Sequence, residues 1–92
     1  MFLECEYDTR NSFYKKAYVE VQKNAFECTK DLYSYGTLVA SIVWNYENHT
    51  LTYKYFGRYS QTTTRHQKEF FKQAGLSDKK IKELFEKGEL IF

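Results

Sequence analysis

The fold is decided by one stretch of nine residues, Gly36-Thr37-Leu38-Val39-Ala40-Ser41-Ile42-Val43-Trp44. It contains no charged residue and is rich in β-branched and large apolar side chains, which is typical of a packed strand. Because side chains alternate along a strand, the stretch presents two apolar faces. One face is formed by Leu38, Ala40, Ile42 and Trp44, and the other by Val39 and Val43. A strand that is apolar on both faces belongs in the interior of a sheet.

Other segments alternate between apolar and polar residues, and short turns connect them with this strand. Strands are predicted over residues 17–22, 25–32 and 50–56. Connections this short make antiparallel pairing the expected arrangement. Residues 1–7 alternate weakly and predict a further short edge strand, and residues 8–12 are typical of a turn.

After Gly57 the apolar residues take the spacing of a helix. A first helix is predicted over residues 65–74, with a buried stripe formed by His66, Phe70, Phe71 and Ala74. A second helix is predicted from residue 78 to Gly88, with a stripe formed by Ile81, Leu84 and Phe85. Residues 90–92 are apolar and are expected either to pack against the sheet or to contact a partner.

Both predicted helices are flanked by residues that typically begin or end a helix. Thr64, followed three residues later by Gln67, matches a capping box, with Thr62 or Thr63 as alternative caps. Ser77 is expected to cap the second helix. Gly75 and Gly88 are expected to end the two helices in the left-handed conformation.

Together these segments predict an α+β fold: an antiparallel meander of four to five strands with two short C-terminal helices packed on one face. The 92 residues are expected to form a single domain, mainly β over residues 1–57 and mainly α over residues 58–92. Because the helices cover one sheet face, the other face is expected to display Tyr and polar residues, including Tyr18 and Lys54.

The composition excludes several classes of protein. No apolar run approaches the roughly 20 residues of a membrane span, and no signal pattern is present, so a cytoplasmic protein without membrane contact is expected. Cys5 and Cys28 lack the spacing of metal ligands, and no Gly-rich phosphate loop is present, so neither metal nor cofactor is expected. The net charge of +2 is milder than that of a dedicated nucleic-acid-binding protein.

One polar segment gathers hydroxyl groups, an arginine and a histidine at a helix start: Tyr59-Ser60-Gln61-Thr62-Thr63-Thr64-Arg65-His66. Helix N-termini favour anions, so this segment could hold a phosphate or a carboxylate. Helix capping alone also accounts for the hydroxyl groups, with His66 packed on the sheet. A small enzyme that uses residues 62–66 is a further alternative. No acidic residue is identified to orient His66, so a non-enzymatic protein is expected.

Basic residues gather in the last third of the chain: Arg58, Arg65, Lys68, Lys72, Lys79, Lys80 and Lys82. Tyr53, Tyr55 and Tyr59 lie near by in the sequence. Charge and stacking rings are the two requirements of a single-stranded nucleic-acid-binding module, which is the alternative function. Because acidic residues are interspersed among the lysines, a mixed soluble surface accounts for the same pattern.

Two stretches resemble small proteins of unassigned function that are encoded by bacteriophages and related mobile elements of Gram-positive bacteria. They are Leu32-Tyr33-Ser34-Tyr35-Gly36-Thr37-Leu38-Val39-Ala40 and the polar segment from Tyr59 to His66. In those proteins a tyrosine-rich turn leads into a Thr-x-Val-Ala strand, and a Tyr-Ser-x-Thr-Thr-x-x-His segment opens a helix. The resemblance covers residues 32–75 and carries over no catalytic residue. It implies a protein that acts by binding host machinery.

The resulting hypothesis is a small non-enzymatic binding protein of phage or mobile-element type. It would occupy a surface of a host protein or of a protein–nucleic-acid complex, because interfaces are enriched in aromatic residues and arginine. Its most specific form is an inhibitor of a defence nuclease, similar to an anti-CRISPR protein. A monomer or a small homo-oligomer is expected. The residues expected to contact the partner are Tyr18, Tyr53, Lys54, Tyr55, Tyr59, Arg65, His66, Lys68 and Lys72.

Overall fold

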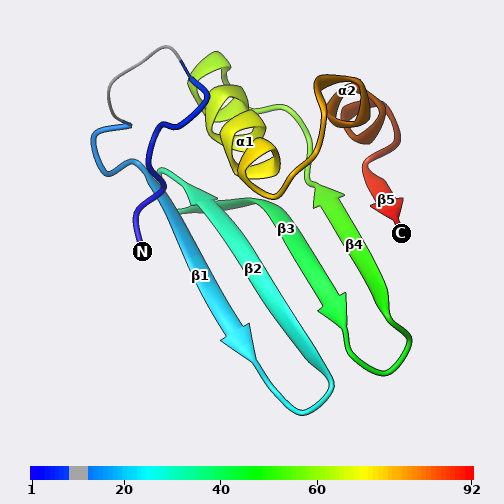
Figure 1. Cartoon of the computed structure of the whole chain (residues 1–92). Helices are drawn as coiled ribbons and strands as arrows, with labels where there is room; N and C mark the ends of the chain where they lie inside the picture. The colour runs from blue at the N-terminus through cyan, green and yellow to red at the C-terminus, as the bar shows by residue number, and fades with distance from the viewer. Residues whose placement is uncertain (9–12) are drawn as a thin grey trace.

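The computed structural model describes residues 1–8 and 13–92, which form a five-stranded antiparallel sheet with two helices on one face (Figure 1). Neighbouring strands in the sheet are also neighbours in the sequence. The strands are β1 Ala17–Lys23, β2 Glu27–Ser34, β3 Thr37–Asn45, β4 Thr50–Tyr55 and β5 Glu89–Ile91. The helices are α1 Gln61–Gln73 and α2 Asp78–Lys87. The predicted α+β meander with two C-terminal helices is confirmed.

The fifth strand comes from the C-terminal residues. Leu90 of β5 lies opposite Tyr53 of β4, so the apolar tail packs as an edge strand of the sheet. At the other edge, the N-terminal segment contributes a single bridge between Phe2 and Tyr18. The predicted strand over residues 1–7 is therefore reduced to one bridge. Of the turn predicted over residues 8–12, residues 9–12 lie outside the described part of the chain.

A bulge in β3 changes the face on which two of its side chains lie. Leu32 pairs with Ala40 whereas Tyr33 pairs with Leu38, which leaves Val39 as the extra residue. Val39 and Ala40 are both buried, and Leu38 is exposed. The prediction that Leu38 shares a face with Ala40, opposite Val39, is therefore wrong. Strict alternation holds only where a strand carries no extra residue.

The core fills the space between the sheet and the helices. Side chains with no exposed surface come from both layers: Ala17, Leu32, Ala40, Phe71 and Leu84. Burying a large apolar side chain contributes about 1.5–3 kcal/mol before the entropy of ordering the chain is subtracted. The helices therefore stay on this face because each supplies large apolar side chains to it.

Helix α1 begins earlier than predicted. The Ser60 hydroxyl accepts a hydrogen bond from the Thr63 amide, so Ser60 is the cap. Thr64 lies inside the first turn and donates its hydroxyl to the Ser60 carbonyl, so the predicted capping box is wrong. The predicted bounds of α2 are confirmed, with Ser77 as its cap and Gly88 ending it in the left-handed conformation. Neither helix is long and apolar enough to cross a membrane.

Candidate functional site

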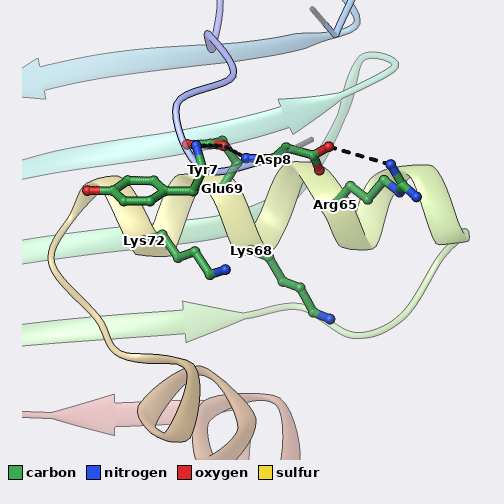
Figure 2. A pocket seen from close by; sticks show the side chains of 6 residues that line it. All are labelled: Tyr7, Asp8, Arg65, Lys68, Glu69 and Lys72. Carbon is green, nitrogen blue, oxygen red and sulfur yellow. Dashed lines mark hydrogen bonds and ion pairs between the residues drawn. The ribbon is translucent and has the colours of Figure 1, made fainter. Parts of the chain in front are cut away.

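A pocket of about 250 Å³ lies along α1, where the N-terminal segment crosses the helix (Figure 2). Three of the predicted partner-binding residues, all cationic, meet there. The lining residues are Tyr7, Asp8, Arg65, Lys68, Glu69 and Lys72. The helical spacing of the three cations is what brings them to one side of α1.

Glu69 holds the N-terminal segment against α1. Its side chain is 1% exposed, and Oε1 accepts hydrogen bonds from the amides of Tyr7 and Asp8, both at 2.8 Å. Oε2 accepts a further bond of 2.7 Å from Gln73 Nε2. Hydrogen bonds to a carboxylate are stronger than those between neutral groups. Sequence analysis missed this residue because the two amides precede it by more than sixty positions.

The three cations of this pocket differ in how they are neutralised. Arg65 Nη1 lies 3.5 Å from Asp8 Oδ1, and Lys72 Nζ lies 3.1 Å from Asp78 Oδ1. The Asp78 side chain is largely exposed, which makes the second pair weak. Lys68 has no ion pair with any residue that the structure describes. The pocket therefore presents positive charge on an exposed helix surface.

His66 is buried, as expected if this histidine packs on the sheet and does not bind an anion. It is 1% exposed, and its Nδ1 lies 2.8 Å from Ser34 Oγ. Ser34 Oγ lies 2.9 Å from Thr63 Oγ1, so the three side chains connect α1 with the end of β2. The Phe13 ring packs edge-on against the imidazole, with 4.6 Å between centroids. A buried imidazole in this position cannot lie on an exposed partner surface.

Of the three tyrosines expected to stack on bases, Tyr53 belongs to the core and Tyr55 packs against it, half-buried. Tyr53 is 5% exposed and packs edge-on against Phe71, while Tyr55 stacks on Phe85 at 4.1 Å. Burial raises the pKa of the Tyr53 hydroxyl above its usual value of 10.0. Only Tyr59, just before α1, is exposed. The expectation that Tyr53 contacts a partner disagrees with its burial, whereas contact by the half-buried Tyr55 stays a prediction.

The opposite side of the sheet, here called the open face, carries Tyr18 and Lys54, as expected. The strand register places side chains across it in three rows. The rows are Tyr18, Tyr33 and Leu38; then Glu20, Asp31, Ser41, Lys54 and Glu89; then Gln22, Thr29, Val43, Thr52 and Ile91. Tyr18, Leu38 and Ile91 are exposed. The open face therefore combines apolar and aromatic surface with a charged middle row.

Metal chemistry has no support in the described part of the chain. No group of three or more His, Cys, Asp and Glu side chains lies close enough there to hold an ion. His66 and Thr63 are both buried, although His66 forms part of the wall of a pocket of about 290 Å³ beside Phe13 and Arg65.

Comparison with known proteins gives one result. Searches of the curated proteins and of the solved structures find no match. One protein-family model matches residues 1–87, which is nearly the whole chain. That family has no assigned activity, so the mobile-element origin suggested by residues 32–75 stays a prediction. The chain belongs to this family, the family of unknown function DUF8033.

Proposed function

We propose that this protein is a non-enzymatic binding protein that occupies a surface of a host protein or of a protein–nucleic-acid complex. The open face is the observation that carries the proposal. Tyr18 and Leu38 are exposed beside Tyr33 in its first row, on a rigid platform of paired strands. Tyrosine is enriched in interfaces, and truncating one at a binding hot spot costs about 2 kcal/mol or more.

The charge of the open face favours a basic partner. Its middle row holds three carboxylates, Glu20, Asp31 and Glu89, against one ammonium group, Lys54. Such a row complements the Lys- and Arg-rich surfaces with which proteins bind nucleic acids. An inhibitor of a defence nuclease is therefore the most specific form of the proposal. Covering the nucleic-acid-binding surface of such an enzyme stops it without any chemistry by the inhibitor.

The other functions considered have less support. The nucleic-acid module built on the helices would have to use Tyr53, which is buried, and Tyr55, which is half-buried and stacked on Phe85. The small enzyme would need His66 and Thr63 at an accessible position, and both are buried. The burial of Tyr53, His66 and Thr63 supports a role in folding for each of them.

A pull-down from bacterial lysate, with and without nuclease treatment, tests the proposal. We expect a protein partner to be retained after nuclease treatment and to be lost with the double variant Tyr18→Ala/Glu20→Lys. The matched control is Tyr46→Ala/Glu47→Lys, which makes the same changes at exposed residues between β3 and β4. The retained partner is then assayed for nuclease activity with and without the protein. Release of every partner by nuclease, or full binding by the open-face variant, would overturn the proposal.

A further inference from the structure

A wide concavity lies at one end of the open face, and tyrosines and lysines dominate its lining. It encloses about 630 Å³. We call it the tyrosine pocket; it is lined chiefly by Lys15, Lys16, Tyr18, Tyr33 and Tyr35, with Glu20 at its margin. Tyr18 is 42% exposed and Tyr35 is 58% exposed, so both rings are accessible to a ligand.

Two tight turns build this pocket. Tyr14 and Lys15 have φ values of 52° and 61° in the first turn, and Tyr35 has a φ of 51° in the second. The Tyr35 amide donates a hydrogen bond of 2.9 Å to the Lys16 carbonyl, which joins the turns. Positive φ favours Asn and Gly and is unfavourable for Tyr and Lys. Turn propensity therefore does not account for these side chains, and strain of this kind is typical of binding sites.

The rings are also held in place by their neighbours. Tyr18 lies opposite Tyr33 in the register of β1 and β2. The Phe2 ring packs edge-on against Tyr18 with 5.5 Å between centroids, and Lys15 Nζ lies 6.0 Å from the Phe2 centroid. Two ammonium groups face one carboxylate, that of Glu20, so the pocket carries net positive charge. It thus combines oriented, accessible rings with cations.

We propose that the tyrosine pocket binds single-stranded nucleic acid, with bases stacked on Tyr18 and Tyr35 and flanking phosphates paired with Lys15 and Lys16. Exposed rings beside cations are the combination by which proteins bind single strands. A duplex keeps its base faces stacked on one another and cannot use the rings. The carboxylates of the middle row adjoin the pocket and confine the strand to this end, so weak binding is expected. This activity goes beyond the proposed protein contact and does not depend on it.

Fluorescence anisotropy with labelled oligothymidylate and oligouridylate of about 15 nucleotides tests the proposal and tells DNA from RNA. With two phosphates paired, log K should fall against log salt with a slope of about −1.4. Lys15→Gln/Lys16→Gln should bring this slope close to zero. Tyr18→Thr and Tyr35→Asn, chosen to suit a strand and a positive φ, should each weaken binding by about fivefold or more with the slope unchanged.

Matched controls separate this pocket from general electrostatic attraction. Lys79→Gln/Lys82→Gln removes the same charge from α2, and Tyr46→Asn removes an exposed ring far from the pocket. Both should bind as the wild type does. Equal weakening by these controls, equal competition by a duplex, or no binding at low salt would overturn the proposal. Preferential binding of polyglutamate would also overturn it and would indicate an acidic protein segment instead. A protein partner retained from nuclease-treated lysate is a separate result, so the two proposals can fail independently.

Discussion

Helices α1 and α2 lie on the same sheet face, yet different kinds of contact hold them there (Figure 1). Helix α2 buries two apolar residues, Ile81 and Leu84. Helix α1 buries six residues, and four of them are polar: Thr63, His66, Gln67 and Glu69. The polar groups of α1 bond to β2, to the bulge in β3 and to the N-terminal segment. Helix α2 is thus held by apolar area, whereas α1 also supplies hydrogen bonds to irregular backbone.

Gln67 shows why such groups stay in a core. Its Nε2 donates to the carbonyls of Val39 and Gly57, at 3.0 and 3.1 Å. The Gly57 carbonyl belongs to the chain that enters α1, and the Val39 carbonyl, at the bulge of β3, also accepts a bond of 3.2 Å from the Phe56 amide. Its Oε1 is buried without a partner among the described residues, which costs about 1–3 kcal/mol. The two hydrogen bonds donated by Nε2 offset this cost.

The two helices should differ most in how much one glutamate on each contributes to the free energy of unfolding. Glu69→Ala should lower the free energy of unfolding by about 3 kcal/mol, because it leaves the part-buried amides of Tyr7 and Asp8 without the carboxylate that they bond. Glu83→Ala on α2 should change it far less, because its ion pairs with Lys80 and Lys87 are exposed. Urea denaturation of the two variants measures both values.

Amide hydrogen exchange sharpens the same test. In Glu69→Ala, the amides of Tyr7 and Asp8 should exchange faster while those of α2 keep their protection. Equal stability of the two glutamate variants would mean that the contact between Glu69 and the N-terminal segment contributes little to the free energy of unfolding. The proposed difference between α1 and α2 would then be wrong.

A medium effect, equal in both helices, is expected at their first turns. Ser60→Ala and Ser77→Ala should each cost about 1 kcal/mol, because each hydroxyl accepts a bond from an amide three residues on. Thr64→Ala should cost less than Ser60→Ala, because the Thr64 hydroxyl bonds to a carbonyl and satisfies no free amide. Thermal melting of the three variants measures this order. A larger loss of stability for Thr64→Ala than for Ser60→Ala would indicate that Thr64 is the cap, as predicted from the sequence.

The smallest effect concerns pH. A hydrogen bond from Lys87, helped by the charge of Lys80, lowers the pKa of Glu83 below its usual value of 4.5. A carboxyl group whose pKa is lower in the folded state adds stability above its unfolded pKa, and the gain is lost as pH falls through the folded pKa. Glu83→Gln should therefore be slightly less stable than the wild type near neutral pH. The urea midpoints of the two proteins should converge below the folded pKa, and a constant gap down to acid pH would contradict this assignment.

Features that repeat along the chain could be predicted from the sequence, and features that depend on one distant contact could not. The strands and α2 follow from alternation, helical spacing and caps, each carried by several residues. The bulge at Val39 depends on Gln67, twenty-eight positions away. No local pattern contains such a pairing. The cap of α1, by contrast, is local, because the Ser60 hydroxyl accepts a bond from the Thr63 amide, and the sequence prediction chose Thr64 in its place.

The same division holds for the candidate sites. Arg65, Lys68 and Lys72 share one side of α1 because helical spacing is local. Alternation also groups Tyr53 with Tyr55 opposite Lys54, but it does not show how deeply the helices cover each ring, and Tyr53 is buried whereas Tyr55 is half-buried. The tyrosine pocket was missed because it forms only where two separate turns meet.

The anchoring of the N-terminal segment by Glu69 has a consequence during protein synthesis. Tyr7 leaves the ribosome sixty-two residues ahead of the carboxylate that its amide will bond. At about 5–20 residues per second, that interval lasts on the order of 3–12 s. The paired strands β1 to β4 are complete before α1, since each pairs with the strand just made. Tyr7 and Asp8 are therefore translated before the strands and yet reach their final place after them.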